Sequence, residues 1–276
     1  AGEAPVALRC VGPDQPELQQ AFRTLWPRLQ GVLHPQVPRF GALIEQPTEA
    51  GAVELWLPRE WQEGRSYAEL LHDRAERQLV FGAGEVMQLL RQLLPALAVL
   101  HSQQLCHGDL CPANVLRRER DGLPVLLDFA PGGVTPGYAP PQRGRGEPAQ
   151  SWMDLYSLGV VALVLLSGQS PAQLLDPVQL SWRWPALLDA HPELREVLER
   201  LLAQEPSQRY ASASAALQAL QQLPMPDSTG PVARADRTVA LVPPPSPELP
   251  PLAPPPAAAP PKRRRQELKE EAAEGR

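Results

Sequence analysis

Residues 105–130 of the chain read LCHGDLCPANVLRRERDGLPVLLDFA, and this stretch carries the strongest local signals in the sequence. Short apolar runs at 115–116 and 125–127 are each typical of a β-strand. Asp121-Gly122 lies between the two runs, and this dipeptide favours the tight turn of a hairpin because both residues tolerate a positive φ. The stretch therefore predicts a loop followed by a β-hairpin.

Three oxygen-bearing side chains, those of Asp109, Asn114 and Asp128, are expected to meet beside this hairpin. The hairpin reverses the chain, so Asp128 returns toward the loop that carries Asp109 and Asn114. Carboxylate and amide oxygens are hard ligands that suit Mg²⁺, which keeps several waters and shares its other positions with substrate phosphates. The stretch therefore predicts a site for magnesium and a phosphate.

The order of these residues resembles the catalytic and metal-binding segments of protein kinases. His107, Asp109 and Asn114 follow the pattern H-x-D-x-x-x-x-N, and Asp128-Phe129 follows the hairpin as D-F-x. In active members of that family, the residue at Asp109 accepts the proton of the substrate hydroxyl, and those at Asn114 and Asp128 hold two Mg²⁺ ions on the phosphates of ATP. The resemblance implies a catalytic Asp109, metal ligands at Asn114 and Asp128, and ATP and Mg²⁺ as cofactors.

Further segments that resemble the family lie on both sides of this stretch, in the family's order. They are Val6-Ala7-Leu8-Arg9, His34-Pro35-Gln36-Val37, Thr135-Pro136-Gly137-Tyr138-Ala139-Pro140-Pro141-Gln142, Asp154-Leu155-Tyr156-Ser157-Leu158-Gly159 and Glu205-Pro206-Ser207-Gln208-Arg209-Tyr210. One such motif alone is weak evidence, but order and spacing are preserved over five. The chain is identified as a member of the eukaryotic-type serine/threonine kinases of bacteria, of a cyanobacterial-like kind, with an N-terminal truncation and degenerate motifs.

Apolar residues recur with helical spacing in several other stretches. The clearest is Glu85–His101, which predicts a buried helix just before the catalytic segment. Glu17–Leu33 shows the same pattern, but Pro27 inside it should kink or break the helix. Gly51–Trp56 is predicted to be a strand.

The resemblance implies an α+β, two-lobed protein kinase-like fold, with a small, partial, β-rich N-lobe and a mainly helical C-lobe. The kinase-like domain is predicted over 1–223: an N-lobe at about 1–58, a hinge at about 59–64 and a C-lobe at 65–223. Four residues precede the first predicted strand, so a glycine-rich loop is expected to be missing from this chain. A Pro-rich tail without apolar periodicity, 224–276, is predicted to be disordered.

The resemblance also places residues around the nucleotide. Arg9 takes the position of the strand lysine that holds the α- and β-phosphates of ATP in kinases. Ala7, on the same strand, and Leu116, on the first strand of the hairpin, are assigned to nucleotide binding together with Arg9, Asn114 and Asp128.

Several positions depart from the family's pattern. Leu25 stands where a glutamate should pair with the strand lysine, Cys111 replaces the lysine of the catalytic loop, and Ala130 replaces the glycine of D-F-G. Gln142 occupies the position of a glutamate that in kinases pairs with the arginine found here at Arg209. Because phosphoryl transfer depends on positioning and electrostatics, the loss of one such cation typically costs on the order of 10²–10³ in rate.

Two functions are therefore weighed. The first is a protein serine/threonine kinase, weak or unusually configured, that transfers the γ-phosphate of ATP to a protein hydroxyl. The alternative is a pseudokinase, which would bind a nucleotide or a partner without catalysis. Small-molecule phosphotransferases share His107-Gly108-Asp109 but should lack the segments Thr135–Gln142 and Ser207–Tyr210.

Charge and cysteine content bear on partners and location. A net charge of −5 argues against nucleic acid as a partner, and the resemblance implies a protein substrate or partner. The basic run Lys262–Arg265 is a candidate for weak contact with a membrane surface or an acidic partner, although a solvated charge run is the simpler interpretation. Cys10, Cys106 and Cys111 are too few and too irregularly spaced for a disulfide framework, and they indicate reduced thiols and a cytoplasmic location.

Overall fold

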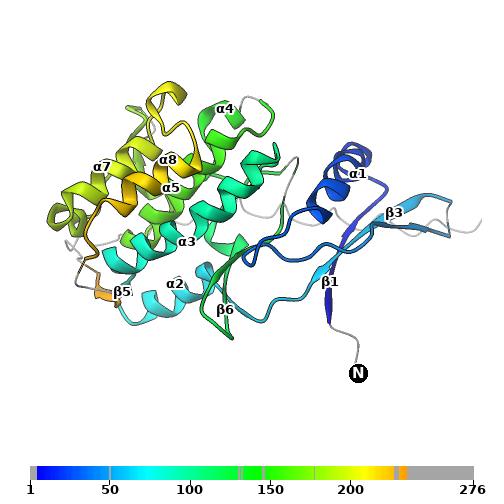
Figure 1. Cartoon of the computed structure of the whole chain (residues 1–276), viewed down its shortest axis with the longest axis horizontal. Coiled ribbons are helices and arrows are strands. Elements are labelled where there is room, and N and C mark those ends of the chain that lie inside the picture. Colours follow the sequence, from blue (N-terminus) through cyan, green and yellow to red (C-terminus); the bar gives the residue numbers. More distant parts are fainter. Residues whose placement is uncertain are drawn as a thin grey trace, which may run out of the picture. The chain divides into compact units, whose positions relative to one another are not determined.

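The N-terminal part of the chain forms a three-stranded antiparallel sheet with one helix connected to it (Figure 1). The computed structural model describes residues 5–49, 51–129, 131, 133–144, 147–176, 178–226 and 230–234, and the structural statements below concern these residues. Strand β3 (Val53–Glu60) lies between β1 (Val6–Val11) and β2 (Ile44–Pro47). Helix α1 (Pro16–Gln30) follows β1 and buries one side in the core.

The register of β1 on β3 determines which side chains share a face. Arg9 lies opposite Leu57, and Ala7 lies opposite Arg59. Leu55 and Leu57 are fully buried. Alternate residues of a strand point to the same side, so Arg59 points toward the interior like the two leucines.

The rest of the chain is mainly helical. The longer helices are α2 (Tyr67–Glu76), α3 (Ala83–Ser102), α5 (Ser151–Ser167), α7 (Pro192–Leu201) and α8 (Ala213–Gln221). The shorter elements are α4 (Pro141–Gly144), α6 (Pro171–Leu174), η1 (Pro112–Asn114), η2 (Ala186–Ala190), η3 (Pro206–Gln208), β5 (Leu79–Val80), β8 (Leu175–Asp176) and β9 (Ser181–Trp182).

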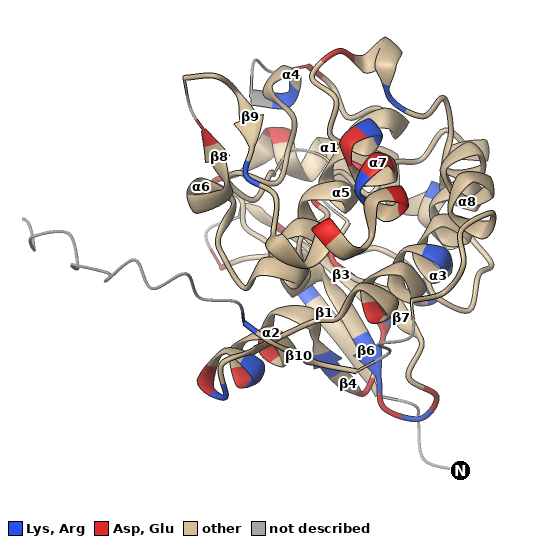
Figure 2. Cartoon of the chain, turned by 90° about the vertical axis from the view of Figure 1, so that its left-hand side faces the viewer, with Lys and Arg blue, Asp and Glu red and all other residues tan. Residues whose placement is uncertain are grey.

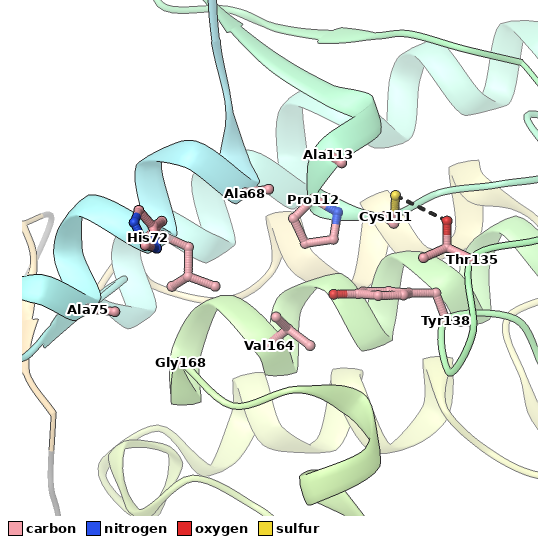
Figure 3. Close-up of a pocket in the computed structure, with 11 residues that line it drawn as sticks. Ala68, His72, Ala75, Cys111, Pro112, Ala113, Thr135, Tyr138, Val164 and Gly168 are labelled. Carbon is pink, nitrogen blue, oxygen red and sulfur yellow. Dashed lines mark hydrogen bonds between the residues drawn. The ribbon is translucent and has the colours of Figure 1, made fainter. Parts of the chain in front are cut away.

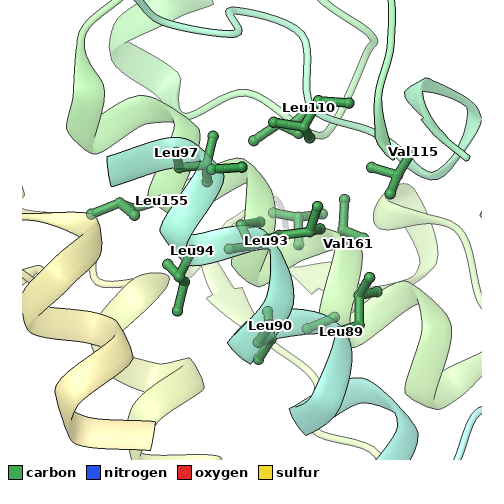
Figure 4. Packing of buried hydrophobic residues seen from close by; sticks show 14 of the residues in the cluster. Leu89, Leu90, Leu93, Leu94, Leu97, Leu110, Val115, Leu155 and Val161 are labelled. Carbon is green, nitrogen blue, oxygen red and sulfur yellow. The ribbon is translucent and has the colours of Figure 1, made fainter. Parts of the chain in front are cut away.

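Helix α5 is the centre of this helical part. Every residue from Met153 to Ser167 is buried, as expected of a helix that is apolar on all sides. Leucines of α3 such as Leu93 face α5 and the loop that carries Leu110 (Figure 4). Each fully buried leucine contributes roughly 1.5–3 kcal/mol relative to an exposed one, so this core holds the catalytic segment firmly from one side.

The predicted hairpin is present. Strands β6 (Val115–Arg118) and β7 (Pro124–Leu126) pair in antiparallel register, with Val115 opposite Leu126. Gly122 adopts a φ of 70° in the turn. On its other side β6 pairs with β4 (Gly64–Ser66), which follows the predicted hinge.

Two predictions about the N-terminal part are corrected by the structure. Strand β3 does not end at Trp56 but continues through Glu60, so Arg59 belongs to the strand. Helix α1 runs through Pro27 without a break. Pro27 removes one backbone hydrogen bond, and the buried side chains of Trp26 and Leu29 on either side of it hold the helix against the core.

The chain after Leu223 includes a further strand. β10 (Val232–Ala233) pairs in antiparallel register with β5, and the N–H of Arg234 donates to the carbonyl of Gln78 at 2.9 Å. By its contacts, the compact unit that holds the kinase-like fold extends to Ala235. The rest of the predicted tail, including Lys262–Arg265, lies outside the described residues.

Charged residues of both signs lie along the surface helices α2 and α7 (Figure 2). No helix in the described part of the chain is long and apolar enough to cross a membrane. Cys10, Cys106 and Cys111 are free thiols.

Candidate active site

The catalytic segment is held by one buried carboxylate on α5. Asp154, which is 2% exposed, accepts hydrogen bonds from the backbone N–H groups of His107 (2.9 Å) and Gly108 (3.0 Å). His101, at the end of α3, places its Nε2 at 2.9 Å from the same carboxylate. A buried carboxylate is tolerable only when it is paired and hydrogen-bonded, and these donors meet that need. They also tie the start of the catalytic segment to the central helix.

Asp109 and Asn114 are brought into direct contact. The Nδ2 of Asn114 donates to the backbone oxygen of Asp109 at 2.9 Å and to its Oδ2 at 3.2 Å. The other carboxylate oxygen of Asp109 accepts from the backbone N–H of Thr135 at 2.6 Å. Thr135, from the segment Thr135–Gln142, is therefore in direct contact with Asp109. The carboxylate is held in one orientation.

His107 joins this loop to the end of the hairpin. Its ring is fully buried, and its Nε2 lies 2.7 Å from the carbonyl oxygen of Leu127. Burial lowers the pKa of His107 below its ordinary value, although the nearby Asp154 opposes the shift. The ring is therefore neutral, and it donates from Nε2 while Nδ1 accepts from the N–H of Asp109 at 3.3 Å.

Asp128 is the residue after Leu127, and its backbone is held in an unusual conformation. The N–H of Leu127 donates to the carbonyl of Asn114 at 2.8 Å, so the start of Asp128 lies beside the metal-ligand candidate Asn114. Asp128 itself has a φ of 55°, a left-handed conformation that costs a non-glycine residue energy. Such strain is concentrated at functional sites. The backbone next to Asp128 thus adjoins Asn114, and Asn114 contacts Asp109, whereas the side chain of Asp128 lies against Arg59.

A line of aromatic rings connects this region to the N-terminal part. Phe129 lies 4.7 Å from the ring of His107 and 5.6 Å from that of Phe40. Phe40 in turn lies 4.9 Å from Trp26 of α1. Edge-to-face pairs at these distances are favourable beyond their buried area. The rings therefore form a continuous line of contacts from α1 to the residue after Asp128.

The cation that faces Asp128 is Arg59, which sequence reasoning assigned to the hinge. Its Nη2 lies 3.5 Å from the Oδ1 of Asp128. Arg9 lines the same small cavity, but its guanidinium lies over the ring of Phe22, 5.0 Å from the centroid. The space enclosed there is about 10 Å³, room for about one water molecule.

The remaining predicted nucleotide residues, Ala7 and Leu116, are not among the described residues that line this cavity. Ala7 is half-buried on β1, opposite Arg59. Leu116 is buried on β6 and packs with Val125 and Leu127. Leu25 is partly buried and packs against the main core, so the position expected for a glutamate contributes no charge.

The donor set suits Mg²⁺ in its chemistry. The amide nitrogen of Asn114 is used in binding Asp109, which leaves the amide oxygen as a potential ligand, and Asp128 has a side chain that is 46% exposed. Within the described ranges there is no cluster of three or more His, Cys, Asp or Glu side chains arranged to hold a metal. One amide oxygen and one carboxylate agree with a metal that takes its remaining ligands from phosphates and water.

A second, larger cavity of about 360 Å³ lies on the other side of the catalytic segment (Figure 3). It is lined by α2, η1, the segment from Thr135 to Tyr138 and the end of α5. The thiol of Cys111 faces it and accepts a hydrogen bond from the hydroxyl of Thr135 at 3.5 Å. Its lining is mostly apolar, and no carboxylate contributes to it.

Sequence reasoning missed Arg59 as part of the site. A signal was available in the alternation of β3, since Leu55, Leu57 and Arg59 are two residues apart and share a face. The strand was predicted to end at Trp56, so Arg59 was not counted among its alternating residues.

Fold and site together define a protein kinase domain. The family model described as "Protein kinase domain" matches residues 27–222, and the chain belongs to this family. The α+β, two-lobed fold predicted from the sequence is confirmed. Members of the family generally use ATP and Mg²⁺.

Individual relatives are bacterial kinases. The chain is 34% identical over 208 residues to "Serine/threonine-protein kinase PknA" of Nostoc sp., an alignment that covers 67% of this chain and 35% of that protein. It is 37% identical over 176 residues to "Serine/threonine-protein kinase-like protein E" of Synechocystis sp., covering 63% and 25%. The chain thus spans about a third or less of the length of these relatives.

Solved structures of bacterial kinase domains have the same fold. The kinase domain of Mycobacterium tuberculosis PknI superposes with a TM-score of 0.64 at 25% sequence identity, covering 78% of this chain and 84% of that one. The prediction of a bacterial eukaryotic-type serine/threonine kinase family is therefore confirmed.

Proposed function

We propose that this chain acts as a protein serine/threonine kinase domain, which transfers the γ-phosphate of ATP to a hydroxyl of a protein. The observation that supports this most is the geometry of Asp109, whose carboxylate is oriented by the N–H of Thr135 and the amide of Asn114. A positioned carboxylate of this kind suits a group that accepts the proton of a substrate hydroxyl. ATP as the donor would place the domain in the cytoplasm.

Asn114 and Asp128 would hold the magnesium ion. The bound metal would neutralise charge on the phosphates as the phosphoryl group moves. Asp109 would orient the hydroxyl and take its proton. Asp154 and His107 would keep the loop and the end of the hairpin in register, because both bind backbone groups on either side of the site.

The alternative is a pseudokinase, and two observations favour it. Arg9, which replaces the strand lysine, lies over Phe22 and forms no ion pair within the described part of the chain. Cys111, which replaces the catalytic-loop lysine, supplies a neutral thiol hydrogen-bonded to Thr135. A module of this kind would bind a protein partner without transferring phosphate.

The test combines binding with transfer. Mg²⁺-ATP at a hundredfold excess over Kd should stabilise the wild type by about 2.7 kcal/mol. Asp128→Asn should abolish this stabilisation because it removes a metal ligand. Asp109→Asn should retain binding and lose transfer to a generic protein substrate. Binding by wild type without any transfer above the Asp109→Asn background would favour the pseudokinase.

The basic run Lys262–Arg265 is proposed to make a weak contact with an acidic partner or a membrane surface. Binding of the full chain to anionic vesicles, compared with a chain in which the four basic residues are replaced by Gln, would test that contact.

A further inference from the structure

The small cavity beside Asp128 holds more positive than negative charge. Among the described residues, two arginines, Arg9 and Arg59, line it together with a single carboxylate, that of Asp128. The other walls are apolar and come from Phe22, Trp26, Phe40, Leu57 and Phe129. Two guanidinium groups and one carboxylate between apolar walls leave an excess of one positive charge. That excess favours an anion beside the exposed carboxylate of Asp128, outside a cavity that has room for about one water molecule.

The two arginines are not equivalent. The side chain of Arg59 is 17% exposed, and its guanidinium reaches the carboxylate of Asp128. Arg9 is exposed, and its guanidinium lies over Phe22. Arg59 is therefore the counter-ion of Asp128, while Arg9 lies farther along the same wall.

The ion pair with Arg59 competes with a metal. The Oδ1 of Asp128 that faces Arg59 is one of the two carboxylate oxygens a magnesium ion would use. A guanidinium and a divalent cation repel each other at that distance. Phosphate oxygens, by contrast, attract a guanidinium strongly, because its planar fork matches their geometry. A metal carrying phosphates would therefore draw Arg59 away from the carboxylate.

We propose that Arg59 is a phosphate-binding residue of this domain, which neutralises Asp128 while no metal is bound and transfers to the phosphate oxygens when Mg²⁺-nucleotide binds. This rests on the proposed nucleotide-dependent function and adds a residue to it. Arg59 reaches the site from β3, opposite Ala7, whereas the strand lysine of the family is represented by Arg9 on β1. Arg59 on β3 thus supplies the positive charge that the strand lysine provides in other members of the family.

The first arm of the test uses Mn²⁺ alone, followed by electron paramagnetic resonance on the full chain. Arg59→Met keeps an unbranched side chain against Phe40 and Phe129 and removes the charge. Mn²⁺ affinity should rise by roughly 1.5-fold to fivefold, the range expected when a partly exposed ion pair is removed. Arg23→Met is the matched control, since Arg23 is paired with Glu45 at 2.7 Å outside the cavity. Its Mn²⁺ affinity should equal that of the wild type.

The second arm uses ATP with Mg²⁺ and isothermal titration. Arg59→Met should weaken nucleotide binding about tenfold or more, and Arg59→Lys should recover part of the loss because it restores the charge without the fork. The proposal therefore predicts that one substitution, Arg59→Met, strengthens Mn²⁺ binding and weakens nucleotide binding. A role confined to packing would not strengthen metal binding while weakening nucleotide binding.

A third arm needs neither metal nor nucleotide. Arg59→Met changes the folding equilibrium constant by some factor in the wild type. In the Asp128→Asn background that factor should be about three times smaller, because the ion pair is already broken. Equal effects in both backgrounds would overturn the counter-ion role. An unchanged or lower Mn²⁺ affinity in Arg59→Met would do the same.

The two proposals can fail separately. If Arg59→Met raises Mn²⁺ affinity and leaves ATP affinity unchanged, transfer to the phosphates is wrong although the ion pair is real. If the wild type and every variant fail to bind ATP, the nucleotide-dependent function is wrong, and the phosphate half of this inference is wrong with it. The ion pair is then judged by the first and third arms alone.

Discussion

At the scale of single residues, the most unusual environment is that of Arg209. Its side chain is buried without a carboxylate: Nε donates to the carbonyl of Ala203 at 2.6 Å and Nη2 to that of Gln204 at 2.9 Å. The guanidinium also lies 4.9 Å from the ring centroid of Trp152 and 4.8 Å from that of Tyr156. Desolvation by burial lowers the pKa of Arg209. Its Nη1 has no hydrogen-bond partner in the described structure.

Gln142 is the residue that should have completed this site. A neutral amide here could offer Arg209 a hydrogen bond in place of an ion pair, but the amide of Gln142 instead donates to the carbonyl of Gln204 at 3.3 Å. Its Oε1 is buried and has no hydrogen-bond partner within the described ranges. Both side chains therefore converge on Gln204, and each leaves one polar atom unsatisfied.

Gln142→Glu should stabilise the domain by about 1–2 kcal/mol, because a carboxylate can accept from the unsatisfied Nη1 of Arg209. Chemical denaturation of wild type and variant measures the change. The gain should vanish in an Arg209→Met background. A destabilised Gln142→Glu variant would show that the carboxylate cannot reach Arg209.

His107 makes stability depend on pH. Burial lowers its pKa in the folded state, so between that pKa and the unfolded value of about 6.5 the unfolded chain binds more protons. The stability contributed by the neutral ring is present above pH of about 6.5 and is lost as the pH falls. The Tm should fall from pH 7.5 to pH 5.

His107→Gln provides the comparison, since its amide can still donate to the carbonyl of Leu127 but does not titrate. The decline of Tm toward pH 5 should be shallower in this variant. Some decline should remain, because burial also lowers the pKa of His34. Parallel profiles of Tm against pH for wild type and variant would show that the decline of Tm does not come from His107.

At the scale of elements, local patterns were sufficient where sequence neighbours form the structure. The hairpin followed from Asp121-Gly122 between two apolar runs, and the predicted helix over Glu85–His101 is part of α3. Contacts between residues far apart in the sequence were harder to predict. Arg59 and Asp128 are 69 positions apart, and their contact depends on the true end of β3 and on the register of the sheet. The alternation of β3 indicates the face on which Arg59 lies, but no pattern within either segment gives the register that brings it to Asp128.

The strand β10 was missed for a related reason. Val232–Ala233 lies in a Pro-rich stretch that was predicted to be disordered from Pro224 onward. Composition indicates which segments lack a core of their own, but it does not exclude a short strand that pairs with an existing edge. Here β10 covers Val80, which is 3% exposed.

This pairing predicts where the stable domain ends. A chain that stops after Leu223 should be about 1–2 kcal/mol less stable than one that stops after Ala235, because it loses the backbone pairing with β5 and exposes Val80. Urea denaturation of the two chains tests this. The chain that ends at Ala235 should match the full chain, and equal midpoints for both truncations would contradict a stabilising role of β10.

At the scale of the whole molecule, two parts converge on one site. The helical core fixes the catalytic segment through Asp154, and the N-terminal sheet supplies Arg59 and Arg9 from the other side. The rings of Trp26, Phe40 and Phe129 connect the two parts. The geometry of the proposed base is thus determined by the core, whereas the charges near the phosphates depend on the sheet.

Transfer of labelled phosphate tests this account most directly. The full chain is incubated with Mg²⁺ and a generic protein substrate, with ATP labelled at either the γ- or the α-phosphate, and the label on serine and threonine is measured. We predict label on the protein from γ-labelled ATP alone, reduced at least about a hundredfold by Asp109→Asn because the proton acceptor is removed. Incorporation by wild type no higher than by Asp109→Asn would contradict the kinase assignment.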